Sequence, residues 1–217
     1  MSSRGMPDRR RQGTLFVVSA PSGAGKTSLC QELVARLPDV RYSVSCTTRK
    51  PRPGEVESRH YHFVDEAMFR GMIKEGAFLE WAEVYGNLYG TPRAPIREWI
   101  AQGIDVLLDI DTQGALQIRR HEPEAVSIYI LPPSLEVLRR RLEDRKGDSP
   151  DEIARRLKKA KDEVKHYHDY MYVIINDDFK FSARQLEAIV LAERTRTAAL
   201  DLSVLENDLL GNEGGSN

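Results

Sequence analysis

The stretch Ser19-Ala20-Pro21-Ser22-Gly23-Ala24-Gly25-Lys26-Thr27 decides the fold that this sequence predicts. It follows a short apolar run, residues 15–18, that is typical of a buried parallel strand. Apolar residues then recur at helical spacing as far as about Pro38, which predicts a helix. A strand, a glycine-containing loop and a helix in this order are the context of a phosphate-binding loop of the Gly-x4-Gly-Lys-Ser/Thr type, although its first glycine is replaced by Ala20.

The residue types of this loop suit the binding of nucleotide phosphates. Gly23 and Gly25 let backbone N–H groups turn toward phosphate oxygens, and the N-terminus of the following helix adds partial positive charge. Lys26 is expected to reach the β- and γ-phosphates, and the Thr27 hydroxyl is expected to ligate Mg²⁺. The predicted ATP-binding loop comprises Ala20, Pro21, Ser22, Gly23, Ala24, Gly25, Lys26, Thr27 and Ser28. The alternative is a chance Gly/Ser turn, against which the two flanks and the Lys-Thr register argue.

Composition describes an ordinary soluble globular protein of 217 residues, 41% hydrophobic and 30% charged. A net charge of −1 provides no basic field, so nucleic acid is not expected as a partner. No apolar run approaches the ~20 residues that span a bilayer, and no secretory leader is recognisable, so no membrane association is expected. Two cysteines, Cys30 and Cys46, make no disulfide framework, and the cytoplasm is the expected compartment.

Strands alternate with helices along the chain, which predicts a three-layer α/β fold with a parallel sheet. After the first strand and helix, an alternating β-branched segment at 41–49 precedes predicted strands at 60–64, 78–85, 104–111, 126–131 and 171–175, and predicted helices at 65–75, 92–102, 112–120, 134–146, 150–166 and 182–196. The expected organisation is a core of residues 13–44, 96–133 and 167–197, with a small, mostly β substrate lobe at 45–95 and a helical lid at 134–166. Residues 1–12 are expected to form a flexible arm, and 198–217 a C-terminal tail that is frayed over 208–217.

Two carboxylates close the predicted strand at 104–111. Parallel sheets place their ligands at the carboxyl ends of strands, so Asp109 and Asp111 are candidates to hold Mg²⁺ or its waters. Two carboxylates at this spacing are also compatible with a strand-end turn. The phosphate-binding loop favours the functional interpretation.

Two groups of arginines indicate their function less specifically than the phosphate-binding loop does. Arg49 and Arg52 lie in a loop stiffened by two prolines, where guanidinium groups match phosphate oxygens, but such a loop can equally be a surface linker. Arg141 and Arg145 share one helix face, and Arg156 lies on the next predicted helix. From spacing alone, a solvated face balanced by neighbouring acidic residues is the favoured interpretation.

Several motifs, taken together, resemble those of the guanylate kinase family. Beside the phosphate-binding loop they are residues 43–55 (SVSCTTRKPRPGE), 61–63 (YHF), 78–84 (FLEWAEV), 86–91 (GNLYGT), 108–114 (LDIDTQG), 130–134 (ILPPS) and 175–178 (INDD). They follow one another in unbroken order over residues 13–197. The resemblance implies phosphoryl transfer from MgATP to GMP or dGMP, giving ADP and GDP, in purine nucleotide metabolism and GMP recycling.

The resemblance also implies site residues. The positions that read guanine are Ser45, Glu80, Thr91 and Asp111. The positions that bind the GMP phosphate are Arg49, Arg52, Tyr61 and Tyr89, with Glu55 in support, and Asp109 is expected beside GMP. Asn176 falls where the family contacts adenine. The expected catalytic groups are Lys26, Arg49, Arg141, Arg145 and Arg156, and Mg²⁺ is expected on Thr27, with Asp109 acting through water. No general base is required, because the acceptor is a phosphate whose second pKa is ~6.

Two departures and three alternatives accompany the resemblance. Cys46 departs from the family in the binding segment, and Lys146 stands where a glycine commonly follows the lid arginine. A related binding module that has lost catalysis would lack a working phosphate-binding loop, and a sugar kinase would lack the guanine-reading set. A GTPase would need an Asn-Lys-x-Asp motif, which the sequence lacks. GMP and ATP are therefore the expected partners, and the sequence leaves the oligomeric state open.

Overall fold

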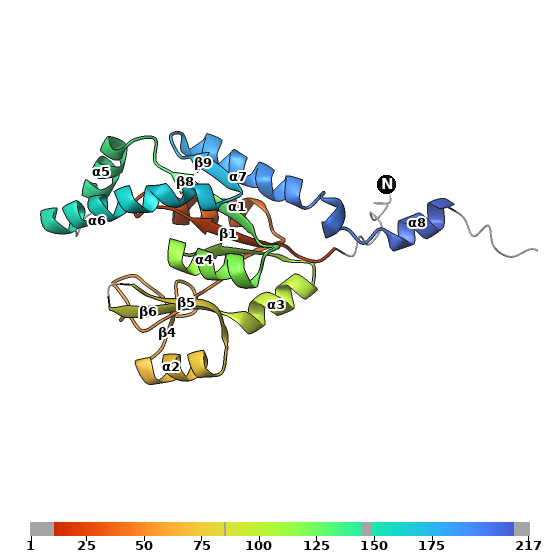
Figure 1. The fold of residues 1–217 in the computed structure, drawn as a ribbon, viewed down its shortest axis with the longest axis horizontal. Helices are drawn as coiled ribbons and strands as arrows, with labels where there is room; N and C mark the ends of the chain where they lie inside the picture. The colour runs from red at the N-terminus through yellow and green to blue at the C-terminus, as the bar shows by residue number, and fades with distance from the viewer. Residues whose placement is uncertain (1–10, 85, 145–148, 211–217) are drawn as a thin grey trace, which may run out of the picture.

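The computed structural model describes residues 11–84, 86–144 and 149–210, and places helices on both faces of a parallel sheet (Figure 1). The main sheet contains β1 (Leu15–Ser19), β2 (Val40–Tyr42), β7 (Asp105–Asp109), β8 (Val126–Leu131) and β9 (Tyr172–Ile175). Its strand order is β2-β7-β1-β8-β9, and every neighbouring pair is parallel. The predicted α/β class with a parallel core is confirmed.

Strand β1 organises this sheet because its side chains alternate between two hydrophobic cores. Phe16 and Val18 pack against α1 (Lys26–Arg36) and α7 (Phe179–Glu193) on one face. Leu15 and Val17 pack against α3 (Arg93–Ala101) and α4 (Thr112–His121) on the other. Burying a side chain of this size contributes about 1.5–3 kcal/mol, so β1 is held from both sides. The carboxyl ends of β1 and β7 therefore meet at a fixed place, with Val18 opposite Asp109.

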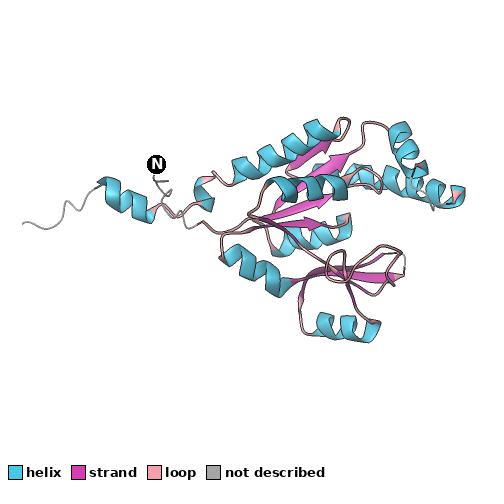
Figure 2. Ribbon diagram, turned by 180° about the vertical axis from the view of Figure 1, so that it is seen from behind, coloured by secondary structure: helices cyan, strands magenta, loops and turns pink. Residues whose placement is uncertain are grey.

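A second sheet lies beside the first, at the bottom of the view in Figure 1 and again in Figure 2. It contains β3 (Cys46–Thr47), β4 (His62–Phe63), β5 (Phe78–Val84) and β6 (Asn87–Pro92), in the order β4-β3-β6-β5. Helix α2 (Glu66–Lys74) covers it through Phe69, whose ring stacks on Phe78 with 4.5 Å between centroids. This sheet therefore has a small core of its own.

Two charged helices project at the other side of the main sheet. Helix α5 (Leu135–Glu143) begins after Ser134, and α6 (Pro150–Glu163) begins after Ser149; both serines accept hydrogen bonds from helical N–H groups as N-caps. Leu138, Leu142 and Ala160 form their shared contact, and the 3-10 helix η1 (Val164–Asp169) leads from α6 to β9.

Some predicted elements were wrong. The segment 41–49 is two strands in different sheets, because the chain leaves β2 after Tyr42 and joins β3 at Cys46. Strand β6 was not among the predicted strands, because glycine and proline are uncommon within strands and its pairing with β5 as a hairpin cannot be seen in its own residues. Helix α7 begins at Phe179 after the N-cap Asp178, earlier than predicted, while α5 and α6 end earlier than predicted.

The ends of the described chain are also more ordered than predicted. Arg11, assigned to the flexible arm, forms a bridge with Leu200 and ion pairs with Asp105. The tail contains η2 (Thr197–Ala199) and α8 (Ser203–Leu210), so helix extends into the region predicted to be frayed. Helix α8 stands away from the body in Figure 1 and exposes Leu209 and Leu210. Residues 1–10 and 211–217 lie outside the described residues.

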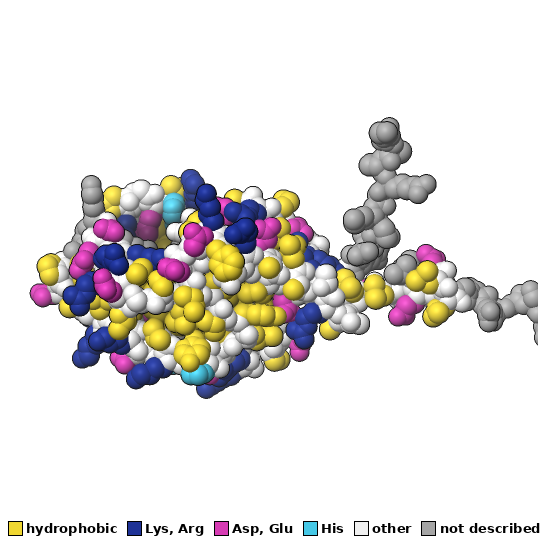
Figure 3. All heavy atoms as spheres, turned by 90° about the horizontal axis from the view of Figure 1, so that it is seen from above, with side chains coloured by type: hydrophobic (Ala, Val, Ile, Leu, Met, Phe, Trp, Pro, Cys, Tyr) yellow, Lys and Arg dark blue, Asp and Glu magenta, His cyan; other side chains and the backbone are white. Residues whose placement is uncertain are grey.

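The surface is not uniformly polar. Figure 3 shows hydrophobic side chains gathered at the middle of one face, with charged side chains around them. Exposed apolar residues include Val173 and Ile175 on the edge strand β9. None of the helices over residues 11–84, 86–144 and 149–210 is both long enough and apolar enough to cross a membrane.

Candidate active site

The loop between β1 and α1 has the backbone of an anion-binding turn. Gly23 and Gly25 adopt φ angles of 92° and 95°, in the left-handed region that favours glycine. Space also demands glycine here, since a Cβ on Gly23 would press on Leu138 and Leu142, and one on Gly25 would collide with Asn176. The loop is therefore enclosed by α5 and by the end of β9, and α1 begins directly after it at Lys26.

Lys26 and Thr27 both lie against Asp109 at the end of β7. Lys26 Nζ is 2.5 Å from Asp109 Oδ1 and donates to the Ile110 carbonyl at 2.8 Å. Thr27 Oγ1 donates to Asp109 Oδ2 at 2.7 Å, and the Tyr42 hydroxyl donates to the same oxygen at 3.0 Å. Burial would lower the pKa of Lys26, but the charge of Asp109 and its hydrogen bond outweigh burial and raise it. Lys26 is thus a permanent cation at the mouth of the phosphate-binding loop.

The oxygen groups of Thr27 and Asp109 are suitable ligands for Mg²⁺. The Thr27 hydroxyl and the Asp109 carboxylate are hard oxygen ligands and already face one another. Among the described residues there is no cluster of three or more His, Cys, Asp or Glu side chains that could enclose a metal ion. A site with few protein ligands is what Mg²⁺ uses when it is bound together with substrate phosphates.

Arg141 and Asn176 hold the loop from the side of α5 and β9. Arg141 donates to the carbonyl oxygens of Asn176 at 2.9 Å and Ala24 at 3.5 Å. The Asn176 side chain donates to the Ala24 carbonyl at 2.7 Å, and its Oδ1 is buried without a hydrogen-bond partner. Asn176 therefore braces the loop backbone, and its expected adenine contact stays a prediction.

The cationic loop after β3 is fixed by a carboxylate. Arg49 binds both oxygens of Glu55, at 3.0 and 2.8 Å, and donates to the Tyr89 hydroxyl at 3.2 Å. The hydrogen bonds from Arg49 hold the pKa of Glu55 below its ordinary value. The Arg52 backbone N–H donates to Glu55 at 2.7 Å while its side chain is exposed. Arg49 also lies over the Tyr61 ring, 5.4 Å from its centroid, so the predicted phosphate-side residues Glu55, Tyr61 and Tyr89 surround Arg49.

The predicted guanine-reading residues form a second cluster. Thr91 donates to Glu80, and Ser45 Oγ lies 3.5 Å from Thr91 Oγ1. Glu80 is 5% exposed. Burial raises the pKa of Glu80 to about 7, against the lowering effect of the Thr91 hydrogen bond and with a further raising effect of Asp111. The buried carboxylate is therefore only partly ionised at neutral pH in the free protein.

Asp111 and α4 form the opposite wall of this cluster. Asp111 Oδ1 caps α4 by accepting from the N–H groups of Gln113 and Gly114, while Oδ2 is buried without a partner. A Cβ at position 114 would collide with Glu80 Oε2, so Gly114 allows the helix to approach the carboxylate. A buried hydrogen-bond acceptor without a donor is costly, and a ligand donor would satisfy it.

Comparison with known proteins settles the family. A family model described as guanylate kinase matches residues 12–193. A curated guanylate kinase of Symbiobacterium thermophilum is 47% identical over 212 residues, covering 96% of this chain and 100% of that protein. Another, from Escherichia coli O157:H7, is 54% identical over 187 residues, covering 85% and 90%. The crystal structure of guanylate kinase from Anaplasma phagocytophilum gives a TM-score of 0.79 at 35% identity, covering 94% and 100%. This chain belongs to the guanylate kinase family.

The remaining residues that the guanylate kinase resemblance singled out are Arg156, Arg145, Lys146 and Cys46. Arg156 lies on α6 and is within 3.4 Å of Glu152, with a side chain only 17% exposed. Arg145, predicted to be catalytic, and Lys146 lie outside the described residues. Cys46 points into the core of the second sheet, and burial raises the pKa of its thiol to about 11. Cys46, where this chain departs from the family pattern, therefore lies in the hydrophobic core of the second sheet and not among the polar groups of the site.

Sequence reasoning missed three residues that shape the guanylate kinase site. Tyr42 was interpreted only as part of an alternating segment, and its hydroxyl reaches Asp109. Gln117 on α4 exchanges two hydrogen bonds with the Trp81 backbone, at 3.2 and 2.7 Å, and so fixes β5 beside Glu80. Gly114 was quoted only within a motif. The sequence carried no signal for Tyr42, because the predicted segment 41–49 placed this residue near its start and not at the carboxyl end of a strand, where ligands gather.

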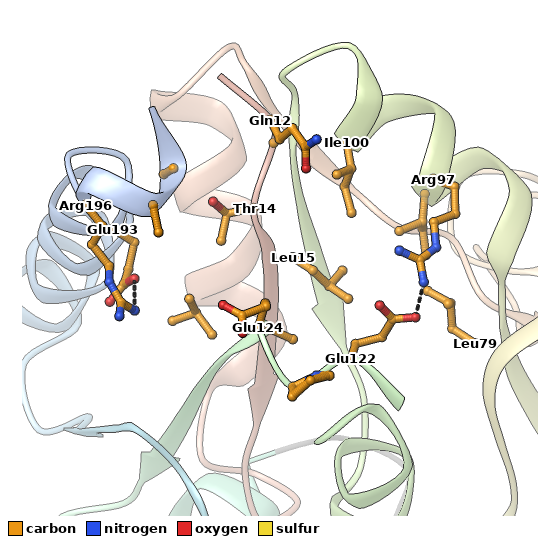
Figure 4. A pocket seen from close by; sticks show the side chains of 17 residues that line it. Gln12, Thr14, Leu15, Leu79, Arg97, Ile100, Glu122, Glu124, Glu193 and Arg196 are labelled. Atoms are coloured by element: carbon orange, nitrogen blue, oxygen red, sulfur yellow. Dashed lines mark hydrogen bonds and ion pairs between the residues drawn. The ribbon is translucent and has the colours of Figure 1, made fainter. Parts of the chain in front are cut away.

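A separate hollow lies at the other end of the main sheet (Figure 4). It measures about 330 Å³ and is lined by Leu15, Leu79 and Ile100, with the ion pairs Arg97–Glu122 and Arg196–Glu193 at its sides. It contains none of the predicted site residues, so the clusters described above are separate from it.

Proposed function

We propose that this guanylate kinase transfers the γ-phosphoryl group of MgATP to GMP, and to dGMP, with the residues described above. The observation that carries the assignment is that the phosphate-binding loop and the guanine-type cluster both adjoin the end of β7. Lys26 binds Asp109 and the Ile110 carbonyl. The next residue, Asp111, caps α4, and Gly114 of this helix lies against Glu80.

Three parts of the chain have separate tasks in this proposal. The second sheet, within residues 45–95, is the GMP-binding lobe, helices α5 and α6 within 134–166 are the lid, and the main sheet is the core. Glu80, Thr91, Ser45 and Asp111 select guanine, and the Arg49 cluster receives the GMP phosphate. The protein is assigned to the cytoplasm, a compartment in which its two buried thiols stay reduced.

Charge neutralisation is the main requirement of the reaction, since two polyanions must approach each other. Lys26 leaves Asp109 for the phosphates of ATP, and Arg49 leaves part of its hold on Glu55 for the phosphate of GMP. Thr27, with Asp109 acting through water, would hold Mg²⁺, which would supply positive charge against the donor phosphates. Arg141 keeps the loop backbone in place, and closure of the lid excludes water that would hydrolyse ATP. The GMP phosphate is already anionic and needs no general base.

An assay of ADP release across the nucleoside monophosphates tests the proposal. GMP should be the preferred acceptor, and Lys26→Ala should lower turnover by orders of magnitude while leaving the fold intact. Lys74→Ala, on the exposed end of α2, is the matched control and should keep wild-type turnover. Near-wild-type turnover of Lys26→Ala with GMP would contradict the assignment of the loop.

A further inference from the structure

Asp109 is held by three side chains in the described part of the chain, and one of them takes no part in phosphate binding. Lys26 contacts Oδ1, whereas Thr27 and Tyr42 both donate to Oδ2. Tyr42 comes from β2, which belongs neither to the phosphate-binding loop nor to the second sheet. The three donors therefore reach one carboxylate from two independent elements.

The position of Tyr42 follows from the pairing of β2 with β7. Tyr42 lies opposite Leu107, so its ring stands near the carboxyl end of β7, where Asp109 ends the strand. The ring packs against the core on the α1 face, and its hydroxyl points to the carboxylate. The packing of the ring therefore fixes the place of the hydroxyl that donates to Asp109.

Binding of MgATP removes two of the three donors. In the proposed function, on which this inference rests, Lys26 turns to the phosphates and the Thr27 hydroxyl turns to Mg²⁺. Asp109 then keeps only the bond from Tyr42 among these three. A carboxylate that loses its other hydrogen-bond partners is free to change rotamer unless a fixed group holds it.

We propose that Tyr42 is a positioning residue of the nucleotide site, which holds Asp109 through Oδ2 so that the carboxylate keeps its orientation toward Thr27 and toward the Mg²⁺ or waters expected there. Outer hydrogen bonds of this kind orient a metal's ligands and are worth a measurable part of metal affinity. The effect is confined to the metal-dependent part of nucleotide binding, because Tyr42 contacts none of the residues of the phosphate-binding loop through a described hydrogen bond.

Tyr42→Phe tests the proposal because it removes only the hydroxyl. Affinity for a non-hydrolysable ATP analogue is measured by calorimetry with Mg²⁺ and again with excess EDTA. The ratio of the two dissociation constants gives the gain in affinity for the ATP analogue that Mg²⁺ provides. That gain is expected to fall about three- to tenfold in Tyr42→Phe, while the affinity in EDTA stays within about twofold of wild type.

Two further variants separate positioning from general packing. Tyr172→Phe removes a tyrosine hydroxyl that also donates to a carboxylate, that of Glu193, on the edge strand β9, and it should keep the wild-type gain. In an Asp109→Asn background, Tyr42→Phe should add little further loss, because the charged acceptor is already absent. A gain within about twofold of wild type in Tyr42→Phe, an equal loss in Tyr172→Phe, or fully additive losses with Asp109→Asn would each overturn the inference. Failure of the wild type to phosphorylate GMP would instead overturn the proposed function, and the binding measurement would still stand.

Discussion

The carboxyl group of Glu80 is buried beside Asp111, an arrangement that disfavours its charge until a ligand arrives. Its pKa of about 7 lies above the ordinary value for glutamate, so its protonated form stabilises the free protein. That stability is fully present below the ordinary pKa and is lost as the pH rises through about 7. In the proposed function, guanine is expected to reverse the balance, because its N1–H and N2–H groups can donate to the ionised carboxylate.

Glu80→Gln is expected to lower kcat/KM for GMP by at least about tenfold, because an amide cannot accept from both guanine donors as a charged group does. The loss should be smaller toward IMP, which lacks the N2 amine. Steady-state kinetics on both acceptors check this. Equal losses on GMP and IMP, or no loss on GMP, would show that Glu80 does not read guanine.

The pH dependence of GMP use should report the same carboxylate. Between pH 8 and pH 6 the ionised fraction of Glu80 in the free protein falls from about nine tenths to about one tenth, given a pKa of about 7. The value of kcat/KM for GMP should fall with it, by about tenfold. Glu80→Gln provides the control, since its profile should lack this step while retaining the titration of the GMP phosphate. A wild-type profile parallel to that of the variant would refute the assignment.

At the scale of elements, helix α5 of the proposed lid lies directly against the phosphate-binding loop. Leu138 and Leu142 lie where a side chain on Gly23 would be, and Arg141 holds the carbonyl of Ala24. If the lid closes as proposed, movement of α5 is expected to shift this loop. Helix α6 packs against α5 through Ala160, so the two helices are expected to move together.

Closure should compact the molecule when both substrates bind. In small-angle X-ray scattering, GMP plus a non-hydrolysable ATP analogue is expected to reduce the radius of gyration relative to the free protein. Either ligand alone is the control and should give a smaller change. Identical scattering profiles with and without both ligands would count against a lid formed by α5 and α6.

Sequence patterns predicted an element best where the element's own residues determine whether it is a helix, a strand or a turn. The apolar run of β1, the glycines of the loop and the caps of the helices each act within a few residues, and the corresponding elements were predicted. Strand β6 was missed because its partner β5, rather than its own residues, makes it a strand. The split between β2 and β3 depends on two sheets that local alternation does not distinguish.

At the scale of the whole molecule, one fully buried carboxylate joins the two ends of the described chain. Asp105 binds Arg11 at 2.6 and 3.1 Å, Arg194 at 2.7 Å and the Thr14 backbone N–H at 2.8 Å. Arg11 precedes β1 and Arg194 caps the end of α7. The network closes the end of the sheet that lies opposite the site, so it supports the fold and not the chemistry.

Asp105→Asn is expected to lower the free energy of unfolding by about 3 kcal/mol, because two guanidinium groups lose their buried counter-charge. Urea denaturation measures this, and kcat should remain near wild type. Asp169→Asn is the control: its ion pair with Arg119 is about half exposed, so its loss should cost about 1 kcal/mol or less. Comparable destabilisation by the two changes would mean that the Asp105 network is no stronger than a surface pair.

The candidate site was predicted from motifs, but its contacts were not. Bonds such as Tyr42 to Asp109 and Gln117 to Trp81 join residues that are distant in sequence, and only the assembled sheets bring them together. Spacing alone favoured a solvated face for Arg141, whereas the folded chain turns it onto the loop. The roles of the motif residues stay predictions until the variants are measured.

The strand order of the main sheet has a consequence for synthesis on the ribosome. Strand β1 emerges first, yet both of its neighbours, β7 and β8, are translated only after the entire second sheet. At ~5–20 residues per second, β1 and the loop after it wait ~5–20 s for these partners, with an apolar strand unpaired in the nascent chain. All strands of the second sheet lie within residues 46–92 and meet no such delay. In the nascent chain, the second sheet is therefore expected to fold before the main sheet that contains β1.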